Sequence, residues 1–551
     1  MDRSEYSAKL DQWVDAHRDE MTADIAALVR IDSTKGEAKE GMPFGEGPAA
    51  AVAAMQELMA KYGFATKNYD NYCVAGDLAG EGRKSLDILA HLDVVPVSED
   101  WTKTKPFEPL VEGNFMYGRG TADDKGPAVA ALYAMRAIRE LGLPLRSGVR
   151  LICGSDEECG SSDLEHYYSI EKEADYTFSP DANFPLINIE KARLEKKIFA
   201  DLPEDYKTPC ILEIEAGSKS NVVPGYADAA FHGLTEEQIR EAVEETSAEI
   251  KKINAELAAA RTTGATGDAG GNGDAGATGD RCATGDAGAA GDRCAAGDAG
   301  ATGDRVATGD RCATGDAAGK GKPVPAAAIP IFKWEVQGDR ELVHVKGQTG
   351  HAAMPDNGSV NALTALLLLI QKLPLANTKT TRTIRALGEL FPYGDFHGKA
   401  LGVDLKDEES GELTISLDVL SFQNGHLTAD FDSRAPLCAT EENLTEKMRA
   451  ELAAKGLTME EGGMTPAHYV SADSPLVKKL LGSYEHYFGK PGKPLAIGGG
   501  TYVHELKNGV AFGCEVEGFD NRMHGDDEVV DLDVLVKSAK IFADAILQIC
   551  G

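Results

Sequence analysis

The chain has 551 residues, with 56 Lys and Arg against 89 Asp and Glu, which gives a formal charge of −33 at pH 7. That charge disfavours nucleic acid and anionic membranes as partners, because both select basic surfaces. The length exceeds what one hydrophobic core usually supports, so we expect an acidic, soluble enzyme of two or more domains.

The N-terminal segment and the cysteines predict a cytoplasmic protein. Residues 1–20 are polar and charged and lack the apolar core of a signal peptide. Apolar runs such as 363–370 are far too short to span a bilayer. The ten cysteines lack the spacing of a disulfide framework, which favours free thiols in a reducing compartment.

The first half of the chain carries the pattern of a parallel α/β sheet. Residues 85–92 and 148–153 are short aliphatic runs typical of buried strands. Between them, residues 125–141 have helical spacing and end at Gly142, a favourable residue after a helix. The order strand, helix, strand predicts a parallel sheet, in which active sites lie beyond the carboxyl ends of the strands.

Residues 262–322 differ from the rest of the chain. They contain no Leu, Ile, Phe, Tyr or Trp, and the pair Gly-Asp recurs every six residues. A collagen helix, a calcium-binding β-roll and a hexapeptide β-helix each fit the period or the composition poorly. We therefore expect a disordered insertion, protruding between a helix at 235–260 and a strand at 331–337.

Five successive elements end in, or run into, imidazole or carboxylate groups: His91 with Asp93, Asp123 with Asp124, Glu157 with Glu158, Asp181, and His524. Each group alone is typical of an ordinary loop or helix start. Adjacent carboxylates at the end of a buried strand repel one another unless cations compensate them. A set rich in nitrogen and oxygen donors without thiolates suits Zn²⁺, Mn²⁺ or Co²⁺, which favours a dinuclear hydrolase.

Five motifs in this order resemble the metal motifs of the M20 metallopeptidases, and within that family the PepV-like dipeptidases: His91-Leu92-Asp93, Gly118 to Gly126, Asp156-Glu157-Glu158, Ser179-Pro180-Asp181 and Met523-His524. The resemblance covers nearly the whole chain outside the repeat. It implies an α/β fold, namely an M20-type catalytic domain with a mostly parallel sheet, and an inserted α+β lid domain that carries the repeat. We expect the catalytic domain at 1–190 and 465–551 and the lid at 191–464.

Carried over residue by residue, the resemblance implies two divalent metal ions per chain, Zn²⁺ or Mn²⁺, with Co²⁺ as an active substitute. Asp123 would bridge the two ions. One ion would also bind His91 and Asp181, and the other would bind Glu158 and His524.

The resemblance also implies three catalytic residues around the metals. Asp93 would hydrogen-bond His91 and fix its tautomer. Glu157 would be the general base that takes a proton from the metal-bridging water. His351, within Gln348 to Pro355, would come from the lid to stabilise the oxyanion of the tetrahedral intermediate.

The resemblance assigns substrate contacts to the lid and to a glycine-rich loop. Asn221 matches a family asparagine that contacts the substrate. Arg434 matches an arginine that binds the C-terminal carboxylate of the substrate, a natural pairing for a guanidinium fork. Gly499, Gly500 and Thr501 match a loop that also contacts that carboxylate.

The resulting hypothesis is a metal-dependent dipeptidase that hydrolyses unblocked dipeptides, its partners being small peptide substrates. An N-acyl-amino-acid or succinyl-diaminopimelate deacylase would use the same metal site. A non-enzymatic binding or scaffold protein displayed through the repeat is a third alternative. The long lid favours a monomer that supplies its own His351 over a homodimer. Residues 525–528, after Met523-His524, are more acidic than the family pattern, so the sequence does not select one metal.

Overall fold

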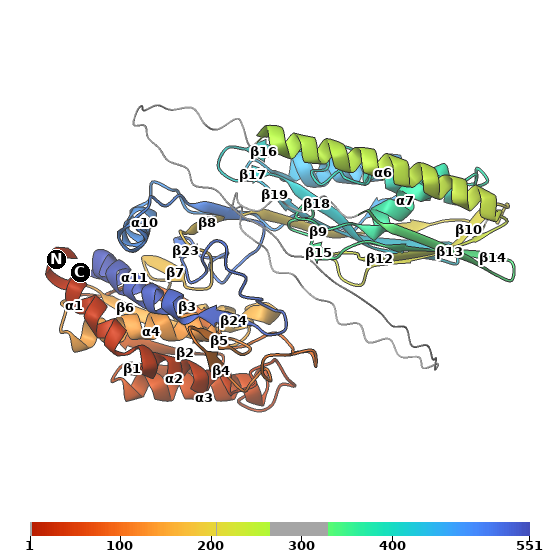
Figure 1. Ribbon diagram of the computed structural model, residues 1–551. Helices are drawn as coiled ribbons and strands as arrows, with labels where there is room; N and C mark the ends of the chain where they lie inside the picture. Colours follow the sequence, from red (N-terminus) through yellow and green to blue (C-terminus); the bar gives the residue numbers. More distant parts are fainter. Residues whose placement is uncertain (1–2, 205, 265–328) are drawn as a thin grey trace, which may run out of the picture.

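The computed structural model describes residues 3–204, 206–264 and 329–551 (Figure 1). These residues form two large β-sheets. Helices pack against each sheet around a separate hydrophobic core. From residue 265 on, the predicted insertion at 262–322 lies outside the described residues, so its disorder stays a prediction. The elements expected on either side are confirmed as helix α6 (Glu236–Gly264) and strand β13 (Ile331–Gln337). Residues 262–264, expected to be disordered, instead form the end of α6.

The first sheet has parallel strands at its centre. Its nine strands are β1 (Ala65–Tyr69), β2 (Cys73–Leu78), β3 (Lys84–His91), β6 (Gly148–Gly154), β7 (Tyr176–Ser179), β8 (Ile187–Glu190), β21 (His468–Tyr469), β22 (Leu495–Ile497) and β23 (Gly509–Ala511). Their order is β1-β2-β6-β3-β7-β23-β8-β21, with β22 beside β8. The neighbours β6, β3, β7 and β23 run parallel, so their carboxyl ends meet at one edge. Antiparallel strands flank them on both sides.

Helices cover both faces of the first sheet. They are α1 (Arg3–Ala16), α2 (Arg18–Val29), α3 (Glu46–Lys61), α4 (Lys125–Glu140), α5 (Ser162–Ile170), α10 (Pro475–Phe488) and α11 (Leu532–Cys550). Along β3, Leu86, Ile88 and Ala90 join the core that contains α4 and α11, whereas Leu89 joins a smaller core with α5. This alternation is the two-residue period of a strand.

The central strand, helix and strand predicted from the sequence are confirmed as β3, α4 and β6. Helix α4 is buried on nearly every side, which accounts for its many alanines. Its first turn packs closely on the loop before it, because a Cβ atom at Gly126 would lie 2.1 Å from the carbonyl oxygen of Thr121. Glycine at this position therefore fixes how the helix follows the 118–123 loop.

A smaller three-stranded sheet lies at the edge of this domain. It consists of β4 (Leu110–Glu112), β5 (Phe115–Tyr117) and β24 (Val529–Asp531), in the order β24-β5-β4. The pairing of β24 with β5 joins the C-terminal part of the chain to residues 110–117. The loop that precedes β24 carries His524.

The second sheet is antiparallel throughout and forms a separate domain (Figure 1). Besides β13, its strands are β9 (Ala192–Asp201), β10 (Cys210–Ala216), β12 (Tyr226–His232), β14 (Arg340–Lys346), β18 (Thr414–Gln423), β19 (His426–Ala435) and β20 (Thr458–Met459). The order is β13-β14-β12-β10-β18-β19-β9-β20. Helix α6 packs on its core with α7 (Ala362–Lys372), α8 (Lys379–Leu390) and α9 (Lys447–Ala454).

Short elements complete the second domain and its connections. A two-stranded ladder pairs β11 (Val222–Val223) with β15 (Gly350–His351), and another pairs β16 (Lys406–Asp407) with β17 (Gly411–Glu412). The six-residue helix at Glu441–Glu446 leads into α9. The chain passes from the first sheet to the second between β8 and β9 and returns between β20 and β21. The expected α/β fold with a second sheet domain is thus confirmed, while the domain boundaries stay predictions.

In the described ranges, no helix combines the length and the apolar character that crossing a bilayer requires.

The first and last helices are joined by a buried carboxylate. Asp544 of α11 accepts hydrogen bonds from the guanidinium of Arg3 at 2.8 and 2.6 Å and from the hydroxyl of Tyr6 at 2.6 Å. We predict that Asp544→Ala lowers the free energy of unfolding by about 2 kcal/mol, because it leaves these donors without an acceptor. Urea denaturation measures the change. The control is Asp533→Ala, which removes an exposed ion-pair partner of Arg18 and also lies in α11. It should lower the free energy of unfolding by less than about 1 kcal/mol. Equal losses in the two variants would contradict the prediction.

Candidate metal centre

The edge formed by the carboxyl ends of the parallel strands gathers the predicted metal ligands. His91 is the last residue of β3, Glu158 follows β6, and Asp181 follows β7. Asp123 comes from the loop before α4, and His524 comes from the loop before β24. Segments that are far apart in the chain therefore meet above one edge of the sheet.

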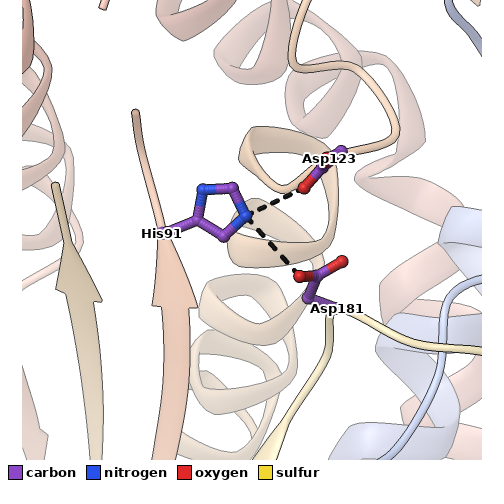
Figure 2. A group of neighbouring side chains, drawn as sticks. All are labelled: His91, Asp123 and Asp181. Atoms are coloured by element: carbon purple, nitrogen blue, oxygen red, sulfur yellow. Dashed lines mark hydrogen bonds and ion pairs between the residues drawn. The ribbon is translucent and has the colours of Figure 1, made fainter. Parts of the chain in front are cut away.

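The structure brings these five side chains together in two groups that share Asp123. In the first, Nε2 of His91 lies 2.8 Å from Oδ1 of Asp123 and 3.6 Å from Oδ2 of Asp181. Figure 2 shows the three side chains pointing toward one another. In the second, Nε2 of His524 lies 2.8 Å from Oδ2 of Asp123 and 3.2 Å from Oε1 of Glu158. Asp123 thus offers one oxygen atom to each group.

Asp123 is buried, and the side chains of Glu158 and Asp181 beside it are only 9% and 16% exposed. Burial raises the pKa of Glu158 to about 7, and the charge of Asp123 adds to the shift. Burial also raises the pKa of Asp181 and of Glu157. Among the described residues, no lysine or arginine forms an ion pair with Asp123, Glu158 or Asp181. Carboxylates that are buried without such partners, beside two imidazoles, fit a site for divalent cations.

Asp93 links the first histidine to the acidic pair after β6. The Nδ1–H of His91 donates to the backbone carbonyl of Asp93 at 3.0 Å, which leaves Nε2 facing Asp123. The Asp93 carboxylate is farther from Nδ1, at 3.5 Å. Its two oxygens instead accept the backbone N–H groups of Glu157 and Glu158, at 3.2 and 3.1 Å. The backbone of Asp93 therefore orients His91, and its side chain holds the acidic pair.

Glu157 lies beside the two groups without belonging to either. It begins a single helical turn, Glu157–Cys159, and its pKa responds to the charges of His91 and Asp181 as well as to burial. Glu158 is the next residue in this turn. Its side chain belongs to a donor group, whereas that of Glu157 does not.

His351 lies in the β11–β15 ladder of the second domain, and Asn221 directly precedes β11. His351 pairs with Val222, and the N–H of Ala352 donates to the carbonyl of Asn221 at 3.0 Å. Nδ1 of His351 accepts the N–H of Ala353 at 3.0 Å, so the ring proton of the neutral imidazole is on Nε2. Burial lowers the pKa of His351, and the charges of Arg434 and His524 lower it further.

Arg434 joins the second domain to the glycine-rich loop at 498–501. Its guanidinium donates twice to Asp432, at 2.7 and 2.6 Å, and once to the carbonyl of Gly498, at 2.7 Å. At the other end of the loop, the N–H and hydroxyl of Thr501 donate to buried Glu190 at 3.1 and 2.8 Å. The loop that contains Gly499 and Gly500 is thus held from both domains.

Sequence reasoning missed several residues that support this centre. Glu190 holds Thr501 through two hydrogen bonds. Asp124, which the sequence groups with Asp123, has a supporting contact that the sequence does not indicate: its carboxylate accepts the backbone N–H of His91 at 3.0 Å. Arg119 and Glu528 form a buried ion pair next to the Asp123 loop. Arg119 lies in the motif at 118–126 and Glu528 in the acidic run at 525–528, but a pairing across the chain leaves no local signal in the sequence.

Residues 88–548 match peptidase family M20/M25/M40. The chain belongs to this peptidase family. Over 97% of both chains, the peptidase is 29% identical to YtjP of Bacillus subtilis, which is named as a candidate dipeptidase. It is 27% identical to the Beta-Ala-Xaa dipeptidase of Lactobacillus delbrueckii subsp. lactis over 98% of this chain and 97% of that one. The structure of human carnosine dipeptidase 1 shares the fold, with a TM-score of 0.51 and 12% identity over 98% of each chain.

The peptidase should depend on the Asp93 carboxylate through the acidic pair. We predict that Asp93→Ala lowers turnover about 10- to 100-fold, because the N–H groups of Glu157 and Glu158 lose their acceptor. His91 keeps its backbone partner, so a cation beside His91 should bind as in the parent, whereas a cation beside Glu158 should bind more weakly. Steady-state kinetics and metal analysis measure both effects, with exposed Asp100→Ala as the control. Unchanged turnover in Asp93→Ala would contradict this role.

Proposed function

We propose that this peptidase is a metal-dependent dipeptidase that hydrolyses unblocked dipeptides. The observation that carries the proposal is the pair of donor groups that share Asp123. Two relatives that match nearly the whole chain are named as dipeptidases, which supports the substrate class. The expected setting is peptide turnover in the cytoplasm, and the expected form is a monomer.

His91, Asp123 and Asp181 would hold one divalent cation, and Asp123, Glu158 and His524 would hold the other. Imidazole nitrogens and carboxylate oxygens without thiolates suit Zn²⁺ or Mn²⁺, with Co²⁺ as a substitute. When bound, two such cations lower the pKa of a water molecule and polarise the scissile carbonyl group.

Glu157 would act as the general base. It lies outside both donor groups, yet it is next to Glu158 and shares the buried environment of the centre. A carboxylate in this position takes the proton from the attacking water and transfers it to the leaving amine. The Asp93 carboxylate would keep Glu157 in place by accepting the backbone N–H of Glu157.

His351 would stabilise the negative charge that develops on the oxygen of the scissile carbonyl group. The hydrogen bond from Ala353 occupies Nδ1, so the Nε2–H of a neutral ring is free to donate to a developing negative charge. The charge of His524 contributes to the lowered pKa of His351 within the same chain.

Arg434, Asn221 and the glycine-rich loop would bind the rest of the dipeptide. Three of the five N–H groups of Arg434 are used on Asp432 and Gly498, which leaves two for a substrate carboxylate. Asn221 directly precedes Val222, the residue that pairs with His351. Gly499, Gly500 and Thr501 follow Gly498 directly, so a carboxylate near Arg434 would also meet this loop.

A dipeptidase differs from a deacylase in the N-terminal end of its substrate: it must accept a free α-amine. We predict that the chelator-stripped protein, reloaded with Mn²⁺, Zn²⁺ or Co²⁺, cleaves a free dipeptide and leaves its N-acetylated and N-succinylated forms intact. Chromatography of the products measures cleavage, and Glu157→Ala should abolish it, because the variant has no carboxylate to move the proton. Cleavage of the acylated forms alone would instead identify a deacylase with the same metal residues. No cleavage by fully loaded protein would favour a non-enzymatic binding or scaffold function.

The oxyanion role of His351 predicts a loss in turnover without a loss of metal. We expect His351→Ala to lower kcat about 10²- to 10³-fold, because one donor to the developing charge is gone. Metal content and folding should stay unchanged, since His351 lies outside both donor groups. His344→Ala removes an exposed histidine from strand β14 just before it and is the control. An equal effect of the two substitutions on kcat would contradict the role.

A further inference from the structure

The acidic run at 525–528 is not used by the proposed mechanism, yet it ends in a buried carboxylate. The side chain of Glu528 is fully buried, and its ion-pair partner Arg119 is only 2% exposed. Such a charge needs several hydrogen-bond partners to be tolerated in the interior. Within the described part of the chain, the hydrogen-bond partners of its carboxylate all belong to residues 119–123.

Glu528 binds the backbone on both sides of Ala122. Its Oε1 atom accepts the N–H groups of Gly120 at 3.0 Å, Ala122 at 2.9 Å and Asp123 at 3.3 Å. Hydrogen bonds to an ionised carboxylate are stronger than those between neutral groups. They orient the peptide group of Asp123 itself, the residue shared by the two donor groups.

Arg119 connects the same carboxylate back to the His524 loop. Its Nη1 donates to Oε2 of Glu528 at 2.6 Å, and its Nη2 donates to the carbonyl of Gly525 at 3.0 Å. Gly525 is the residue after His524. The pair therefore forms a closed link between the segment that carries Asp123 and the segment that carries His524.

The His524 loop needs such support because its backbone is strained. Arg522, His524 and Asp527 have φ angles of +53°, +60° and +57°, a region that residues other than glycine seldom adopt. Conformations of this kind persist where the surrounding contacts hold them. Asp527 is held by the N–H groups of Thr102 and Lys103, at 2.8 and 2.7 Å, and the next residue is Glu528.

We infer that Glu528 and Arg119 are positioning residues that set the spacing between Asp123 and His524. They hold the group formed by Asp123, Glu158 and His524 in a geometry that binds its cation tightly. Neither residue touches a donor atom of that group; both act through the backbone. The inference rests on the proposed function, because it takes this group as a cation site.

The test is a Mn²⁺ titration of the chelator-stripped full chain by calorimetry, with the parent compared to Glu528→Gln. Glutamine keeps the shape of the side chain but loses the charge that binds three N–H groups and Arg119. We expect two cations in the parent and, in Glu528→Gln, one cation bound about 10- to 100-fold more weakly. The paramagnetic resonance signal of a coupled Mn²⁺ pair should weaken in parallel. The control is Glu517→Gln, which removes one exposed charge from the segment between β23 and His524. This variant should bind both cations like the parent.

Parent-like affinity for both cations in Glu528→Gln would overturn the inference, even if its thermal midpoint fell, because a purely structural role predicts that result. If Glu528→Gln does not fold, Arg119→Lys provides the second variant. Lysine keeps the charge but cannot reach Glu528 and Gly525 with a planar fork, so the same selective weakening is expected, and parent-like affinity would again overturn the inference. A parent that binds fewer than two cations would overturn the proposed function together with this inference.

Discussion

The carboxylate of Asp123 is the feature on which the rest of the centre depends. Its two oxygens lie 2.8 Å from the imidazoles of His91 and His524, so it belongs to both donor groups. One buried carboxylate between two sites requires that the backbone around it be held firmly, since a small rotation would favour one group over the other. Gly126 sets how α4 follows this loop, and Glu528 binds the N–H groups around Asp123.

The fold brings the remaining residues to Asp123 by two different means. Parallel strands β3, β6 and β7 deliver His91, Glu158 and Asp181 to one edge, as the topology of such sheets dictates. His524 and the glycine-rich loop lie in irregular segments next to two short strands, β24 and β22. These segments are fastened by buried charged side chains, namely Glu528 and Arg119 for the first and Glu190 and Arg434 for the second.

The sequence predicted which side chains gather at this edge of the sheet and several of the elements that carry them, while their roles as metal ligands stay predictions. Aliphatic runs and helical spacing indicated β3, α4 and β6, because these elements have local periodicity. The motifs placed histidine and carboxylate residues after successive elements, which is also local information. The fold class and the M20 family followed from the same residues and agree with the structure and the comparison with known families.

The supporting contacts could not be predicted, because they join residues with no relation in the sequence. Glu528 and Gly120 are 408 positions apart, and Arg434 and Gly498 are 64 apart. For Asp93, the expected contact with His91 comes mainly from the backbone carbonyl, while the carboxylate turns to the N–H groups of Glu157 and Glu158. The choice between two nearby partners depends on tertiary geometry, which no motif encodes. The most direct test of the shared carboxylate is anomalous diffraction from crystals of the protein grown with Mn²⁺. Two peaks about 3.5–4 Å apart, one beside His91 and Asp181 and the other beside Glu158 and His524, with Asp123 reaching both, would support the account; a single peak, or a pair that does not include Asp123, would contradict it.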